Sequence, residues 1–195
     1  VAFSGNGEPT SSPSFAAAVE VALRLMRQRE VTVPLTVITN GSMLNKKAVI
    51  TAVEQIGGAG GRVWFKHDAA TSEAASRING QPIDVEAHLQ RARTICRLCP
   101  TWIQTCVFAI DGAPPPDDEL ASYREQVSDL VADGVRGVLL YTLARPSLQP
   151  EAPRLSALPG DWLDAFAGRL RADGVVVELG DTPDTPDTPD TPDPG

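Results

Sequence analysis

Short apolar runs alternate with longer amphipathic segments along residues 1–180. Apolar runs bounded by turn residues indicate buried strands, which we expect at residues 1–3, 35–38, 63–67, 102–110, 137–142 and 175–179. Apolar residues at helical spacing predict helices at residues 15–26, 45–56, 72–78, 85–98, 117–132 and 161–172. This alternation is typical of a parallel α/β domain, either barrel-like or doubly wound. Continuous apolar strands further indicate a sheet that is covered on both faces.

Local signals support several of the expected helix ends. Asn45 is predicted to cap the second helix, and Gly57-Gly58 is predicted to end it. Asp84 has the short carboxylate side chain that caps helices well, so it is expected to begin the helix over residues 85–98.

Polar residues follow four of the expected strands directly. Residues 5–9 follow the first strand, Asn40 the second, Asp68 the third, and residues 142–146 the fifth. In parallel α/β folds the carboxyl ends of the strands meet at one edge, where ligand sites are built. We therefore expect a ligand site at this edge of the sheet.

Size and hydropathy indicate one domain over residues 1–180. The chain has 195 residues, of which 42% are hydrophobic, enough for one sizeable core. No apolar run is long enough to cross a bilayer and no basic leader precedes an apolar stretch, so neither a membrane span nor a signal peptide is expected. Three cysteines without a leader favour the reducing cytoplasm.

Residues 181–195 have a composition of their own. They repeat Asp-Thr-Pro four times and end in Asp-Pro-Gly, which predicts a disordered, solvated tail. The formal net charge of −8 includes five aspartates of this tail. Nothing in the remaining residues shows the basic balance of nucleic-acid-binding domains, which mildly disfavours an RNA substrate.

The turn after the first strand has chemistry suited to holding an amine. Gly5 and Gly7 flank Asn6 and allow a ligand to approach the backbone closely. Glu8 offers a carboxylate that can accept hydrogen bonds from an ammonium group, and Pro9 restricts the exit of the turn. A plain strand–helix turn with a surface glutamate explains the same residues. The turn lacks the third glycine of a dinucleotide fingerprint and the lysine of a phosphate loop.

Three successive strand ends resemble those of the radical S-adenosylmethionine (SAM) superfamily. The matching segments are Gly5-Asn6-Gly7-Glu8-Pro9-Thr10, Thr39-Asn40-Gly41-Ser42 and Lys66-His67-Asp68-Ala69. Further on, Arg77-Ile78-Asn79 and Thr142-Leu143-Ala144-Arg145-Pro146 look like the subgroup of iron–sulfur oxidoreductases that includes wyosine-type tRNA-modifying enzymes. The resemblance covers roughly residues 1–150 in order. It implies a partial (β/α) TIM-like barrel.

The resemblance implies a chemistry as well as a fold. In this family a Cys-x3-Cys-x2-Cys loop after the first strand holds a 4Fe–4S cluster, which binds the amino and carboxylate groups of SAM. Reductive cleavage of SAM, with electrons from an external donor, yields a 5′-deoxyadenosyl radical that abstracts hydrogen from the substrate. The family's substrates include small molecules, peptides and RNA bases, and the sequence leaves open which of these the chain would use.

Carried over to this chain, the resemblance implies a set of cofactor-binding residues. It implies that the turn Gly5-Asn6-Gly7-Glu8-Pro9 holds the SAM amino group and that Asn40 lines the pocket. It also implies that Lys66 and Asp68 lie near the ribose or the carboxylate, since residues two apart on a strand share a face. Gln104 is expected to face the same cavity from the next strand.

The chain departs from the family pattern at its beginning. The family's first strand and cysteine loop would come before Val1, so we expect either a fragment or an internal GTG codon taken as the start. Cys96, Cys99 and Cys106 lack the spacing of that loop and come late in the fold. They are interpreted as structural thiols.

Three cationic or titratable residues have alternative interpretations. His67 falls between two cavity-facing positions, so its side chain is expected to face the helices and to pack there. His88 is the other histidine of the chain and could approach Cys96 only loosely, which makes a zinc site unfavourable. Arg145 either binds a phosphate or carboxylate of the substrate or forms a surface salt bridge.

Two functions follow from these residues and stay open at this point. The first is a portion of a radical SAM enzyme downstream of its cluster loop. The second is a cluster-less binding or scaffold protein that keeps the same pocket. An unrelated phosphate-binding barrel is disfavoured, because the carboxylates of Glu8 and Asp68 would repel a phosphate beside them.

Overall fold

The computed structural model describes residues 1–4, 7–144 and 150–180. Its strands are β1 (Ala2–Phe3), β2 (Thr36–Thr39), β3 (Arg62–Lys66), β4 (Thr101–Cys106), β5 (Phe108–Ile110), β6 (Val138–Tyr141), β7 (Leu155–Ala157) and β8 (Val177–Leu179). Its helices are α1 (Phe15–Gln28), α2 (Lys47–Gly58), α3 (Ser72–Asn79), α4 (Val85–Leu98), α5 (Asp117–Ala132) and α6 (Gly160–Ala172), with short 3-10 helices η1 (Pro9–Ser11) and η2 (Ala152–Arg154). The predicted tail, residues 181–195, lies outside the described residues.

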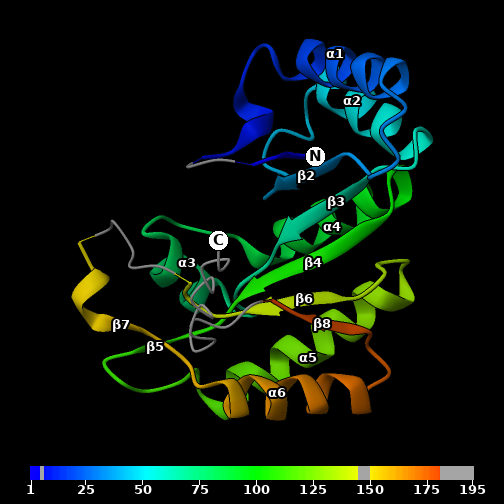
Figure 1. Ribbon diagram of the computed structural model, residues 1–195. Coiled ribbons are helices and arrows are strands. Elements are labelled where there is room, and N and C mark those ends of the chain that lie inside the picture. Colours follow the sequence, from blue (N-terminus) through cyan, green and yellow to red (C-terminus); the bar gives the residue numbers. More distant parts are fainter. Residues whose placement is uncertain (5–6, 145–149, 181–195) are drawn as a thin grey trace, which may run out of the picture.

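Six strands form one parallel sheet in the order β1-β2-β3-β4-β6-β8 (Figure 1). The strand order never reverses along the chain, whereas a doubly wound sheet has a point at which it reverses. The sheet is not closed among the described residues, because β1 and β8 do not pair with each other. The structure is therefore an open, barrel-like α/β fold, as the sequence resemblance predicted.

Helices cover one face of this sheet. In Figure 1, α1 and α2 lie at the β1–β2 end, α4 lies behind β3 and β4, and α5 and α6 lie at the β6–β8 end. The strand side chains on this face are completely buried, and they include Val37, Val63, Phe65, Ile103 and Leu140. Because each fully buried large apolar side chain contributes about 1.5–3 kcal/mol, this layer supplies most of the hydrophobic stabilisation.

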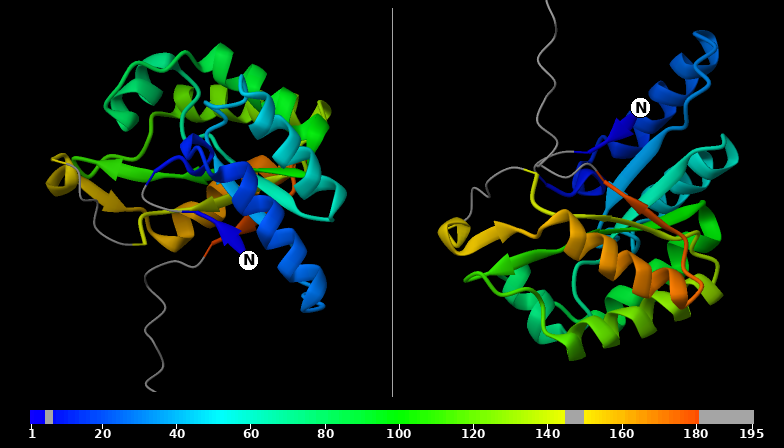
Figure 2. Two further views of the ribbon diagram at one scale, coloured as in Figure 1. Left: turned by 90° about the horizontal axis from the view of Figure 1, so that it is seen from above. Right: turned by 60° about the horizontal axis from the view of Figure 1, so that its bottom comes forward.

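The opposite face of the sheet, here called the open face, is only partly buried. Its half-buried side chains include Ile38, Trp64, Trp102, Leu139 and Tyr141. In the two views of Figure 2 the helices lie outside the curve of the sheet, and none of the described ones packs across the open face. The prediction that the sheet is covered on both faces therefore holds for only one face of the described structure.

The prediction of one long strand over residues 102–110 was wrong. The chain forms β4, interrupts the strand at Val107, and then forms β5, which leaves the main sheet and pairs antiparallel with β7. After β5 the chain turns at Asp111 and Gly112, which both have positive φ angles. The sequence pattern missed β7 because three partly exposed residues after a 3-10 turn carry no strand periodicity.

Of the predicted helix-end signals, only the Asp84 cap is fully confirmed. Asp84 caps α4 by accepting a hydrogen bond from the Ala87 N–H at 3.1 Å. The predicted cap at Asn45 was wrong, since Lys46 precedes the first residue of α2 and makes no side-chain cap. Gly57 and Gly58, which were predicted to follow the helix, are instead its last two residues. No helix of the described part is long and apolar enough to cross a membrane.

Candidate functional site

Glu8 joins the first turn to the carboxyl end of β2. Its Oε1 accepts hydrogen bonds from the hydroxyls of Thr10 and Thr39 and, at 3.1 Å, from the Thr10 N–H. Its Oε2 accepts a hydrogen bond from the Asn40 N–H at 2.8 Å. Four donors around one carboxylate fix the turn against the strand, because hydrogen bonds to a charged acceptor are strong. The turn thus lies at the edge where the sequence predicted a site, while Gly5 and Asn6 lie outside the described residues.

Asp68 connects the ends of β3 and β4, as Glu8 connects the first turn to β2. Its Oδ1 accepts a hydrogen bond from the Cys106 N–H at 2.8 Å. Burial raises the pKa of the Asp68 carboxyl, and the Cys106 N–H and the nearby Lys66 ammonium oppose that shift. The carboxyl is therefore held in place by the backbone of the next strand.

Lys66 and Gln104 lie side by side on neighbouring strands. They are register partners between β3 and β4, so their side chains leave the sheet on the same side. Lys66 is exposed and Gln104 is half-buried. The shared face agrees with the sequence prediction, although Gln104 does not line the cavities described below.

His67 faces the helices, as predicted from its position between Lys66 and Asp68. It is 2% exposed, and its ring stacks between the rings of His88 and Tyr123, each with a centroid distance of 5.5 Å. Its Nε2 lies 3.2 Å from Oε1 of Gln126. Burial, with a smaller contribution from His88, lowers the pKa of His67 to about 3, and the Gln126 contact opposes this.

The buried imidazole predicts a loss of stability on acidification. Unfolded His67 takes up a proton below its ordinary pKa of 6.5, whereas the folded chain does not until about 3. The unfolded state therefore binds more protons in this window, and the free energy of unfolding falls as the pH falls, by up to about 1.4 kcal/mol per pH unit. The lowered pKa of His88 acts in the same direction, and the raised pKa of Asp68 acts against it.

The measurement is the urea unfolding free energy of the parent chain and of His67→Phe at pH 7, 6 and 5. All other titrating groups are common to both chains, so the variant is expected to show the shallower pH dependence. Equal slopes for the two chains would contradict a neutral, buried His67.

Two cavities adjoin at the carboxyl edge of the sheet around Asp68. The first, about 400 Å³, includes three predicted site residues, Asn40, Lys66 and Asp68, and continues to α4. The second, about 300 Å³, is lined by Asp68, Arg77 and Phe108 among others. The structure thus brings Asn40, Lys66 and Asp68 to one cavity, although they come from two separate strand ends.

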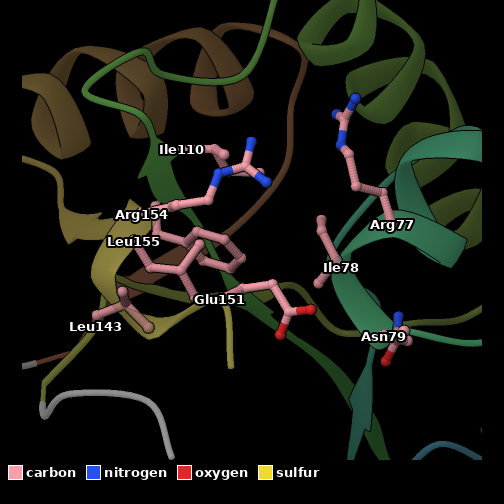
Figure 3. Close-up of a pocket in the computed structure, with 10 residues that line it drawn as sticks. Arg77, Ile78, Asn79, Ile110, Leu143, Glu151, Arg154 and Leu155 are labelled. Carbon is pink, nitrogen blue, oxygen red and sulfur yellow. The ribbon is translucent and has the colours of Figure 1, made fainter. Parts of the chain in front are cut away.

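A third cavity, about 320 Å³, extends the site toward the β5–β7 pair (Figure 3). Arg77, Ile78 and Asn79 line it from the end of α3, opposite residues of β5, η2 and β7. In Figure 3 the side chain of Arg77 lies on one side of the cavity and that of Arg154 on the other. The side chain of Glu151 lies between them in this view. Arg154 is exposed and pairs with Asp111 at 2.6 Å, which joins the end of β5 to the start of β7.

Sequence reasoning missed the β5–β7 side of this cavity. The segment Arg77-Ile78-Asn79 resembles the family pattern, but the sequence predicts no role for it. No sequence motif predicted that this cavity would be lined by Phe108, Glu151 and Arg154. The reason is that β7 lies more than forty positions from β5 along the chain. Arg145, the predicted substrate ligand, lies outside the described residues.

The cysteines do not form a cluster site in the described residues. No group of three or more histidine, cysteine or acidic side chains there could hold a metal ion. Burial raises the thiol pKa of Cys99 and of Cys106 to about 12, with the Asp68 carboxylate adding to the shift at Cys106. Thiols that resist ionisation are poor metal ligands. Their interpretation as structural thiols agrees with these environments.

Comparison with known proteins gives matches only at the level of structure. No family model and no curated protein matches the chain. Among solved structures, a domain of pyruvate-formate lyase-activating enzyme from Bacteroides vulgatus ATCC 8482 matches with a TM-score of 0.64 and 16% identity, over 93% of this chain and 98% of that one. A radical SAM methyltransferase from Sphaerobacter thermophilus matches with a TM-score of 0.62 and 16% identity, over 92% of this chain and 50% of that one.

TYW1 with a lysine-pyruvate adduct bound is a third neighbour, with a TM-score of 0.59 and 21% identity over 88% of this chain and 49% of that one. The chain therefore spans nearly all of the first neighbour and about half of the length of the other two. One of the three neighbours is named as a radical SAM enzyme, the methyltransferase. The chain shares the open, partial (β/α) barrel fold of these neighbours, which is the fold that the resemblance of its strand ends predicted.

Proposed function

We propose that this chain binds SAM along the carboxyl edge of its sheet, as the cofactor- and substrate-binding portion of a radical SAM enzyme. The observation that carries the proposal is the continuity of the three cavities. The first two share Asp68, and the second and third share Arg77 and Phe108. Together they form a groove along the strand ends of this fold, where parallel α/β proteins bind their ligands.

The groove changes from polar to apolar along its length, which suits the two ends of SAM. SAM has a charged methionine end and a flat adenine, and the adenine binds best between apolar side chains. Asn40, Lys66 and Asp68 supply amide, ammonium and carboxylate groups at one end. Ile78 and Phe108 supply apolar surface at the other. We therefore assign the methionine and ribose groups to the first end and the adenine to the second.

Most of the remaining predicted residues have places in this proposal. Gly7, Glu8 and Pro9 keep their role beside the SAM amino group, with the orientation of the turn fixed by the hydrogen bonds of Glu8. Gln104 is the register partner of Lys66 but lines none of the three cavities, so this proposal gives it no contact with SAM. Gly5, Asn6 and Arg145 keep the roles that the resemblance implies.

The described residues do not fit a 4Fe–4S cluster. Cys96, Cys99 and Cys106 are protonated thiols on the helix and strand layers, and no other ligand set is present in the described part. The cluster of the family would need ligands from outside these residues. The second function, a cluster-less SAM-binding protein without radical chemistry, stays the alternative.

Asp68→Asn is expected to weaken SAM binding about tenfold or more. An amide replaces a carboxylate that would bond a charged or hydroxyl group of SAM, and a hydrogen bond to a charged group is worth about 1.5–3 kcal/mol. The Asn Oδ1 can still accept the Cys106 N–H, so the fold is retained. Isothermal titration calorimetry with SAM measures the effect. Asp129→Asn, an exposed position on α5, is the matched control and should bind as the parent does.

Absence of any SAM binding by the parent chain would overturn the proposal. If SAM binds, the chain extended by the coding segment in frame before Val1 is incubated anaerobically with iron, sulfide and a reductant, and an assay for 5′-deoxyadenosine then separates the two functions. Production of 5′-deoxyadenosine supports the enzyme. Binding without cleavage supports the cluster-less derivative.

A further inference from the structure

Arg91 has a buried donor that no described residue satisfies. It lies on α4 and lines the 400 Å³ cavity beside Asn40 and His88. Its Nε is buried and has no hydrogen-bond partner, and it is the only such side-chain atom found in the described part of the chain. Because buried polar groups in folded proteins are nearly always paired, an unpaired guanidinium nitrogen at a cavity wall points to a ligand.

The charge of the cavity favours an anion. Two cations, Lys66 and Arg91, line it against one carboxylate, Asp68. Neither cation forms an ion pair with any residue that the structure describes. Asp68 is bound through Oδ1 to the Cys106 N–H and would oppose an anion placed beside it. An anion is therefore expected at the α4 end of the cavity, next to Arg91.

The cavity wall around Arg91 is fixed before any ligand arrives. Gly41 has a φ of +70°, and a Cβ there would lie 3.3 Å from the Arg91 Cβ and 2.8 Å from the Phe65 ring. The turn that follows β2 is thus packed directly on the base of the Arg91 side chain. On the other side, Nε2 of His88 lies 2.8 Å from the Lys66 carbonyl oxygen. A preformed wall reduces the entropy lost when a ligand binds.

We propose that the α4 end of this cavity binds an oxyanion, a phosphate or a carboxylate, through the guanidinium of Arg91. An arginine fork binds either group with two parallel hydrogen bonds. The anion can belong to a substrate or be the carboxylate of SAM itself. The proposal adds a binding residue to the site and does not depend on the proposed SAM binding, because the probe is inorganic phosphate alone.

The test compares Arg91→Met with Arg97→Met, an exposed arginine on the last turn of the same helix. Melting temperatures are measured in increasing phosphate and in chloride of equal ionic strength. The parent and Arg97→Met are expected to melt higher in phosphate, as ligand binding to the folded state requires. Arg91→Met is expected to lose this shift, with the apparent affinity for phosphate reduced at least tenfold.

A second readout separates binding from a structural role. Without phosphate, Arg91→Met should be as stable as the parent, because the substitution removes a donor that was unpaired. Competition between phosphate and SAM, with weaker SAM binding in Arg91→Met, would assign the anion to the SAM carboxylate. Unchanged SAM binding in that variant would assign it to another ligand. The absence of a phosphate-specific shift in the parent, or an equal loss in both variants, would overturn the proposal.

Discussion

Glu8→Ala is expected to lower the free energy of unfolding by about 3–4 kcal/mol, the worth of roughly two hydrogen bonds to a charged group. Glu8 accepts four hydrogen bonds, and their contributions do not add because Thr10 provides two of the donors. Its removal leaves the N–H of Asn40 and the hydroxyl of Thr39 without this acceptor. Urea denaturation of the variant and the parent measures the loss.

Glu20→Ala is the matched control for Glu8, since Glu20 is an exposed glutamate on α1. It should change the free energy of unfolding by less than about 0.5 kcal/mol. An equally small effect of Glu8→Ala would show that the carboxylate does not hold the turn. In that case Glu8 would be free to act on a ligand alone.

Phe65→Ala is expected to cost about 3–5 kcal/mol of stability. Phe65 is 0% exposed on β3, and the centroid of its ring lies 4.7 Å from that of the His88 ring. The ring also contacts the turn at Gly41, where an added Cβ would meet it at 2.8 Å. Truncation therefore leaves a cavity between the sheet, α4 and the β2–α2 turn, and it loosens one wall of the proposed site.

Chemical denaturation of Phe65→Ala, Phe65→Leu and Phe108→Ala measures the loss of stability in each variant. The comparison distinguishes the effect of buried volume at Phe65 from the effect of removing an aromatic ring. Phe65→Leu keeps most of the volume and should lose only about 1–1.5 kcal/mol. Phe108 is half-buried on β5 and should lose less than Phe65 when truncated to alanine. Equal losses for the two alanine variants would contradict the central position of Phe65 in the core.

The strand over residues 102–110 shows where periodicity fails. Its residues alternate buried and half-buried from Thr101 to Ile110 without interruption. A run with a single period gives no sign that its second half pairs with β7 and leaves the sheet. The change of partner depends on a turn at Asp111 and on a segment far along the chain. Neither leaves a periodic signal in the strand itself.

The interpretation of Glu8 shows the same limit at a functional position. The sequence offered a ligand for an ammonium group and a plain surface glutamate as alternatives. The structure adds a third role, a carboxylate that holds the end of β2 through Thr39 and Asn40. This role depends on parallel pairing between β1 and β2, which brings residues more than thirty positions apart to one edge.

The sequence by itself determined the alternation of strands and helices, the strand ends that carry the polar residues, and the resemblance to the radical SAM superfamily. These properties are local, because apolar periodicity, capping residues and short motifs act over a few positions. The tertiary structure alone decided the open sheet with one half-buried face, the groove that joins Asp68 to Phe108, and the unpaired donor of Arg91. These depend on which strands pair and which helices pack together, and such long-range contacts leave no periodic trace in the chain.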